Sequence, residues 1–208
     1  LAPRAPARSS TSPHVGLRDI FTGRHQVKGP APDRLFAITT AYVTLQAEHG
    51  IEPAGAAAIV FQALASSDFE ATVKETEQVV SATCSESGTT VSSEDDSYGY
   101  RWMVLRNAAG SPSIEDLAVG LNAVASSIET AGFGERLLCA VFAFQDGQNR
   151  KTYLIYNYKR GTWYPFVPAP GDKQRSVERE LQVKAQIGDE LPIEPELERW
   201  FPLWGIPI

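Results

Sequence analysis

The amino-acid sequence predicts an α+β fold, in which a twisted antiparallel sheet ends in a C-terminal three-stranded meander and is covered by helices. Two observations carry this prediction. Residues 137–167 contain three apolar runs separated by turn signals, which indicates strands joined by hairpins. Directly before them, apolar residues recur at three- and four-residue steps, which is typical of a helix that covers a sheet. Helices gathered on the faces of a hairpin-connected sheet define the α+β class.

The meander is predicted from its three runs in turn. Residues 137–144 are apolar without a break, which is typical of a strand buried on both faces. Asp146-Gly147 is a hairpin signal, and residues 153–158 are rich in the aromatic and β-branched residues that suit a pleated sheet. Residues 162–167 form the third strand. Because Pro165 has no N–H to donate, we expect this strand to lie at a sheet edge or to end there.

The helix before the meander has the clearest pattern in the chain. Ser111 is suited to cap it and Pro112 to occupy its first position. Gly132 is expected to end it. Its apolar stripe consists of Ile114, Leu117, Leu121, Val124 and Ile128.

The remaining elements follow from the same kinds of pattern. Upstream, we expect a helix over 33–48 with Asp33 as its cap, a strand over 57–64, a helix over 69–83, a polar loop over 85–97 with room for a short strand at 89–91, and a strand over 98–106. Downstream, we expect a charged helix over 172–187, a short helix over 194–200 and an aromatic tail that is buried or offered to a partner. The inner side of the charged helix is predicted to hold Val177, Leu181, Lys184 and Gly188.

Composition excludes several classes of protein. Hydrophobic residues make up 43% of the 208 residues, which is enough for a sizeable core. The net charge of −6 argues against nucleic-acid binding and against adhesion to anionic lipid. No apolar run is long enough to span a bilayer, so we expect a soluble protein. The two cysteines, Cys84 and Cys139, are too few for a disulfide scaffold, which fits a reduced, cytoplasmic setting.

The domain organisation is predicted to be simple. Residues 1–13 are Ala, Pro, Arg and Ser without periodicity and are expected to form a flexible tail. Residues 14–32 form an N-terminal arm, and residues 33–208 form a single α+β domain. The arm contains a short amphipathic piece at 15–21, which is interpreted either as docked on the domain or as a docking peptide for a partner or a lipid surface.

The usual signatures of catalysis and metal binding do not occur in the sequence. The three histidines are not spaced with cysteines or carboxylates as a metal site. Glu94-Asp95-Asp96 lacks the glycine and the later glutamate of a calcium loop and is interpreted as a solvated loop. Gly132-Phe133-Gly134 follows a helix instead of preceding one, so it does not fit a dinucleotide-binding turn. We therefore expect no catalytic residues, no metal and no cofactor.

A cluster of aromatic and basic residues remains as the candidate site. Tyrosine, tryptophan and arginine are the usual anchors of protein interfaces, and Lys159 and Arg160 occupy the turn between two aromatic strands. Asn157 is interpreted as structural glue or as a recognition group. The alternative is that most of the aromatic residues are core and that the two cations only solubilise the turn. The candidate partner-binding residues are Tyr98, Tyr100, Asn157, Tyr158, Lys159, Arg160, Trp163 and Trp204.

Four segments resemble a known family. They are DSYGYRW (96–102), ETAGFGERLLCAVFAF (129–144), LIYNYKRGTWYPF (154–166) and ERWFPLWG (198–205). Together they are similar to the PspA-associated protein family of the PspAB type, from about residue 15 to the C-terminus. The resemblance implies an accessory protein of PspA, the membrane-maintenance protein of the bacterial phage-shock response. The order of elements also resembles secretion-chaperone-like and YbjN-like domains, which is an analogy of fold alone.

Three hypotheses for function follow. The first is a non-enzymatic accessory protein that binds PspA or a related coiled-coil protein during envelope stress, in the cytoplasm or recruited through that partner to the inner membrane surface. The second is a chaperone-like module that binds segments of other clients. The third is an enzyme that acts on a small ligand in a pocket behind Tyr98 and Tyr100. A pocket with convergent polar groups would favour the third, and a flat apolar patch would favour the first two.

Overall fold

A computed structural model describes residues 32–208 of the chain. The predicted tail at 1–13 and the amphipathic piece at 15–21 lie outside the described residues, as does nearly all of the arm at 14–32. The division of the chain into tail, arm and domain therefore stays a prediction.

The described residues alternate between helices and strands before the meander. The helices are α2 (Pro32–Phe36), α3 (Ile38–His49), α4 (Ser67–Cys84), α5 (Ile114–Thr130) and α6 (Val177–Ile187), with 3₁₀ turns η1 (Gly134–Arg136) and η2 (Leu197–Arg199). The strands are β1 (Ile51–Gln62), β2 (Thr90–Asp95), β3 (Tyr100–Arg106), β4 (Leu137–Asp146), β5 (Lys151–Asn157), β6 (Thr162–Phe166), β7 (Pro168–Ala169) and β8 (Gln174–Arg175).

Six of the strands form one antiparallel sheet in the order β2-β3-β1-β4-β5-β6, and β7 and β8 form a small separate hairpin. The predicted α+β class and the three-stranded meander β4-β5-β6 are confirmed. β6 is the last strand of the sheet, as the proline at position 165 predicts. Residues 192–194 run beside it, through a hydrogen bond from the Trp163 N–H to the Pro192 carbonyl and a single parallel bridge at Ile193.

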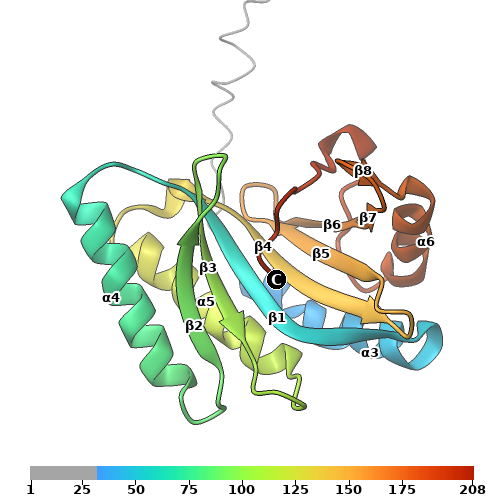
Figure 1. The fold of residues 1–208 in the computed structure, drawn as a ribbon, viewed down its shortest axis with the longest axis horizontal. Coiled ribbons are helices and arrows are strands. Elements are labelled where there is room, and N and C mark those ends of the chain that lie inside the picture. The colour runs from blue at the N-terminus through green and yellow to red at the C-terminus, as the bar shows by residue number, and fades with distance from the viewer. Residues whose placement is uncertain (1–31) are drawn as a thin grey trace, which may run out of the picture.

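Helices cover one face of the sheet and the C-terminal segment covers the other (Figure 1). In the figure, α3 and α5 lie behind the sheet and the C-terminus lies in front of it. Alternation along β3 divides its side chains between the faces: Met103 and Leu105 join the helix-side core, whereas Trp102 and Val104 join the other.

Helix α5 supplies the centre of the helix-side core. All five residues of its predicted stripe are buried: Ile114, Leu117, Leu121, Val124 and Ile128. The helix begins later than predicted, because its cap is Ser113, whose hydroxyl accepts a hydrogen bond from the Asp116 N–H at 3.1 Å. Ser111 and Pro112 belong to the preceding turn. The predicted end is confirmed, since α5 stops at Thr130 and Gly132 follows with φ of +86°.

The C-terminal strap, residues 200–208, seals the opposite face. Trp200 and Ile208 are buried there against the sheet, with Leu203, Trp204 and Ile206 partly buried beside them. Side chains of the sheet hold the main chain of the strap. The Tyr153 hydroxyl donates to the Ile208 oxygen at 2.8 Å, and the Tyr164 hydroxyl donates to the Phe201 oxygen at 3.1 Å. Buried aromatic surface and satisfied carbonyls together explain why an irregular segment packs on a sheet.

Several predicted boundaries are wrong. β1 begins at Ile51 rather than at 57, because an irregular register between Pro53 and Ala57 lets the strand continue through the proline and the glycine at 55. α4 begins at Ser67 with Ser66 as its cap. The loop predicted over 85–97 contains the whole of strand β2. The helix predicted over 33–48 is split at residue 37 into α2 and α3.

The C-terminal helices also differ from the prediction. The residues predicted at 172–175 for the charged helix belong to the β7–β8 hairpin, and α6 begins only at Val177, with Ser176 at its N-cap position. Its buried side holds Glu180, Val183 and Ile187, whereas Leu181 is exposed. The carboxylate of Glu180 faces inward because it accepts hydrogen bonds from the Val167 N–H and from Arg175. The short helix predicted over 194–200 is the 3₁₀ turn η2.

Helix α5 packs closely on its neighbours at Gly120, where a side chain would have no room. A Cβ at this position would overlap the Cδ2 atom of Leu105 and lie 3.3 Å from the Cys84 sulfur. In an open helix, Gly→Ala is stabilising by about 0.5–1 kcal/mol. Here we expect Gly120→Ala to destabilise by about 1–3 kcal/mol because of overpacking. Urea unfolding measures the change, with Val119→Ala on the exposed side of α5 as control. A stabilised Gly120→Ala variant would show that α5 does not pack this closely.

Candidate functional site

A pocket of about 370 Å³ opens on the strap side of the sheet and contains five of the eight candidate residues. These five are Tyr98, Tyr100, Asn157, Lys159 and Trp204. Three parts of the chain that are distant in sequence form its walls: the β2–β3 turn, the turn after β5, and residues 201–204 of the strap. Its other lining residues include Val60, Trp102, Leu138, Cys139 and Tyr164 from the sheet. We call it the aromatic pocket.

The β2–β3 turn owes its shape to Asp96. One carboxylate oxygen of Asp96 accepts hydrogen bonds from the N–H groups of Tyr98 and Tyr100, at 2.8 and 3.0 Å. The other accepts from the Trp102 indole at 2.9 Å. Gly99, with φ of +85°, supplies the left-handed backbone that the turn needs. Asp96 therefore fixes both tyrosines of the pocket and the tryptophan of its floor.

We expected the acidic run before this turn, residues 94–96, to be a solvated loop, but two of its carboxylates bind other groups of the protein. Asp95 forms a bidentate pair with Arg101, through hydrogen bonds of 2.6 and 2.8 Å. These hydrogen bonds and the Arg101 charge lower the pKa of Asp95, against the opposing effect of burial. Among residues 32–208, no group of three His, Cys, Asp or Glu side chains could hold a metal ion.

The turn after β5 forms a second wall. The side-chain oxygen of Asn157 accepts hydrogen bonds from the N–H groups of Lys159 and Arg160, at 3.0 and 3.3 Å. Of the two interpretations of Asn157, these contacts support a structural role, in which its side chain stabilises the turn. The Lys159 side chain is exposed and forms no ion pair within the part of the chain that the structure describes.

Unlike Lys159, the second cation of this turn, Arg160, forms an ion pair. Its guanidinium pairs with Glu194, whose side chain is only 1% exposed. Glu194 also accepts hydrogen bonds from the Thr162 hydroxyl at 3.1 Å and the Glu196 N–H at 3.3 Å. Burial alone would raise the pKa of Glu194. The hydrogen bonds and the Arg160 charge outweigh burial and hold this pKa below its ordinary value.

Tyr158 and Trp163 lie on the other face of the sheet, so they cannot line the same surface as Tyr98 and Tyr100. Both are buried in the core beneath the helices. The Trp163 indole donates to the Arg34 carbonyl at 2.9 Å, and the Tyr158 ring packs edge-on against Tyr156. Both residues therefore belong to the core, which is the alternative that the sequence left open. As buried side chains, they do not form part of the surface of the described chain.

Exposed aromatic side chains surround the mouth of the aromatic pocket. Tyr98 is 53% exposed, Tyr100 is 40% exposed and Phe201 is 59% exposed. The Lys173 ammonium lies 5.6 Å from the centre of the Tyr98 ring, a cation–π distance. Lys173, Asp96 and Phe201 are not among the candidate residues that the sequence indicated. The only sequence signal for the last was its place in the aromatic tail.

The lining of the pocket is suited to binding. Burial raises the pKa of the Cys139 thiol to about 12, so that at neutral pH it is protonated and a poor nucleophile. Burial likewise raises the pKa of Tyr164 well above its ordinary value, and its hydroxyl is engaged with the strap. Within the lining, no nucleophile is hydrogen-bonded to a base. What the lining presents is aromatic surface with few polar groups left free.

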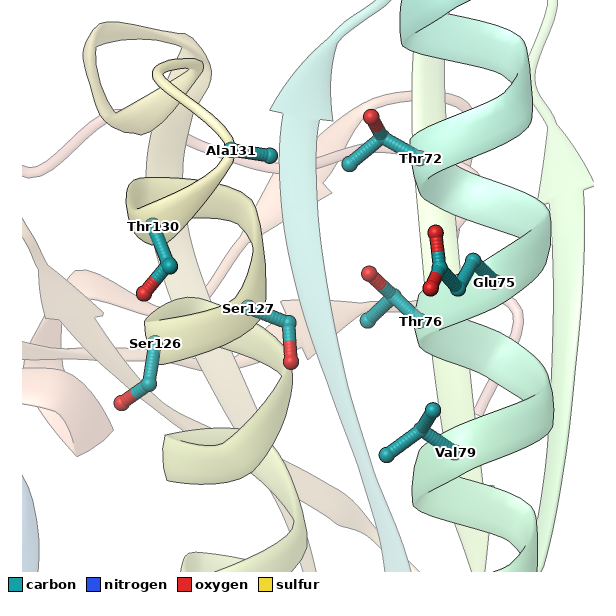
Figure 2. Close-up of a pocket in the computed structure, with 8 residues that line it drawn as sticks. All are labelled: Thr72, Glu75, Thr76, Val79, Ser126, Ser127, Thr130 and Ala131. Carbon is teal, nitrogen blue, oxygen red and sulfur yellow. The ribbon is translucent and has the colours of Figure 1, made fainter.

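A second depression, of about 400 Å³, lies between helices α4 and α5 (Figure 2). Figure 2 shows short side chains from both helices facing it, among them Thr76 and Ser127. The Thr72 hydroxyl bonds to the Asp68 carbonyl of its own helix at 2.8 Å. The depression has no aromatic lining residue and contains a single charged one, Glu75. We therefore take the aromatic pocket as the candidate site.

Comparison with known proteins identifies a family. The sequence model of the family described as PspA associated protein B matches residues 15–208, so the chain belongs to this family. No curated protein and no solved structure matches the chain.

The two cations of the β5–β6 turn should behave differently. Arg160→Ala leaves the buried Glu194 carboxylate without its charged partner, and we expect a loss of about 1–3 kcal/mol of unfolding free energy. Lys159→Ala should change it by less than about 0.5 kcal/mol because the side chain is exposed and unpaired in the described chain. Chemical denaturation of both variants measures the contrast. Equal stabilities would show that the Arg160–Glu194 pair contributes nothing to folding.

Glu194 should also contribute to acid sensitivity. Because its pKa is lowered in the folded protein, its contribution is present above the unfolded pKa of about 4.3 and is lost as pH falls through the folded pKa. We expect Glu194→Gln to be less stable than the parent at neutral pH, with the difference shrinking in acid. Urea unfolding over a pH series tests this. Glu198→Gln, at an exposed position, is the control, and its curve should follow the parent at every pH.

Proposed function

We propose that this member of the PspA associated protein B family is a non-enzymatic accessory protein that binds PspA, or a related coiled-coil membrane-maintenance protein, through the aromatic pocket. The family description supports the partner. The exposed aromatic rim supports the surface, because tyrosine and tryptophan beside a concave site are the usual anchors of binding energy. This rim is the single structural observation that carries the proposal.

The setting of this proposal is the phage-shock response to envelope stress. We propose that the protein acts in the cytoplasm and reaches the inner membrane surface through its partner. Within residues 32–208, none of the helices is both long enough and apolar enough to cross a bilayer. The net charge of −6 also disfavours adhesion to anionic lipid. Contact with a membrane is therefore proposed to depend on PspA.

A second candidate function is favoured by the pocket itself. Its volume of about 370 Å³ lies at the small end of the range for small-molecule sites, and it is located behind Tyr98 and Tyr100. Several of its polar groups are already hydrogen-bonded, and no activated nucleophile lines it. We therefore propose that a small molecule in this pocket would be bound and not chemically changed. The chaperone-like alternative, in which the same rim binds segments of several clients, rests on the analogy of helices packed on one face of an antiparallel sheet.

Binding to PspA tests the proposed function directly. We expect the purified protein to bind purified PspA, and Tyr98→Ala to weaken binding at least about fivefold, as loss of an interface anchor does. The matched control is Val79→Ala, which removes a similarly exposed apolar side chain from α4. Isothermal titration calorimetry gives both affinities. Absence of binding would refute the partner assignment, and equal weakening by both substitutions would refute the assignment of the surface.

A further inference from the structure

We propose that the aromatic pocket receives one bulky apolar side chain from a partner segment that carries carboxylates next to it. This inference rests on the proposed function and specifies the chemistry of the partner at the same site. It follows from three features: the polar groups inside the pocket, the charges at its rim, and the exposure of the rim side chains.

The interior of the pocket suits an apolar occupant because the carboxylate of Asp96, the side-chain oxygen of Asn157 and the hydroxyl of Tyr164 are already engaged. Asp96 accepts three hydrogen bonds, from two backbone N–H groups and the Trp102 indole. The oxygen of Asn157 accepts two, and the Tyr164 hydroxyl donates to the strap. A polar occupant would lose its bonds to water and gain few in return. A bulky apolar side chain gains by burial against the surrounding rings.

Two lysines lie at the rim of the pocket. Lys159 stands on the turn that forms one wall, and Lys173 lies over the Tyr98 ring at another. Neither forms an ion pair within residues 32–208. Both carboxylate oxygens of Asp96, the acidic residue of the pocket lining, accept hydrogen bonds from N–H groups. A partner that places carboxylates beside its apolar anchor therefore complements the rim.

The rim also favours a segment of a protein over a free small molecule. A small ligand fills the interior, but it leaves the outer sides of Tyr98, Tyr100 and Phe201 in water. These side chains are between 40% and 59% exposed. A polypeptide that inserts one side chain can cover the rim with its neighbouring residues, in the arrangement of a buried anchor within a ring of excluded water.

Selection from a display library of random linear peptides tests the inference without presupposing PspA. The purified protein is the bait and its Tyr98→Ala variant is used for counter-selection. We expect the enriched peptides to share an aromatic or leucine residue flanked by aspartate or glutamate. Enrichment of basic or purely apolar peptides, or of none that distinguish the two baits, would overturn the inference.

Fluorescence polarisation of a selected peptide then measures the role of charge. We expect Lys159→Gln to weaken binding by up to about fivefold and to flatten its salt dependence, and Lys159→Arg to restore both. Val79→Ala should leave the affinity unchanged. Equal affinities of the parent and Lys159→Gln at low salt would refute the electrostatic part.

The outcomes separate this inference from the proposed function. If PspA binds but acidic apolar peptides neither bind nor compete, the partner is correct and the pocket chemistry is wrong. If such peptides bind and PspA does not, the pocket chemistry holds and the partner is wrong. Saturable binding of anilinonaphthalene sulfonate, blocked by Tyr98→Ala, together with no selected peptide would assign the pocket to a small aromatic anion and overturn the proposal.

Discussion

Two buried glutamates hold Trp200 at the start of the C-terminal strap, Glu180 through Arg175 and Glu194 through its main-chain carbonyl, and the aromatic pocket depends on that position. Glu180 is fully buried and holds Arg175, whose guanidinium donates to the Trp200 carbonyl at 2.6 Å. The Trp200 indole donates in turn to the Glu194 carbonyl at 3.0 Å. Because Trp200 is held from both sides, the chain leaves it along the sheet and brings Phe201 and Trp204 to the pocket. A charge without a partner at either glutamate would be costly in such a buried environment.

This arrangement ties the pocket to folding more closely than a surface loop would be. Trp204 packs edge-on against Phe166 of β6, and the strap fills the face of the sheet that no helix covers. The rim residues Tyr98 and Tyr100, by contrast, contribute little to the core and are fixed mainly by the backbone contacts of Asp96. Changes at the strap should therefore alter stability and the pocket together, whereas changes at the tyrosines should alter the pocket alone.

The sequence predicts those parts of the fold in which burial follows a simple period. The stripe of α5 and the unbroken apolar run of β4 are examples, because each buries residues that are apolar themselves. It fails where a charged residue is buried with a partner. Glu180 is buried beside Val183 and Ile187 because it pairs with Arg175, and Glu194 is buried because it pairs with Arg160 across 34 positions. Only the start of β2 is predicted, by the short strand at 89–91, because an edge strand of Thr, Ser, Glu and Asp has no apolar alternation.

The same distinction applies to the candidate site. Tyr98, Tyr100 and Trp204 could be named from composition, but their meeting in one pocket depends on the order of the sheet and on the path of the strap. Net charge was also a poor guide to this surface. The chain carries −6, yet the rim presents Lys159 and Lys173 without acidic partners in the described residues. Since charges in physiological salt are screened beyond about 8 Å, a bound segment responds mainly to the cations beside the pocket. An acidic protein can in this way select an acidic partner, provided that its own carboxylates are paired with arginines, as Asp95 and Glu194 are.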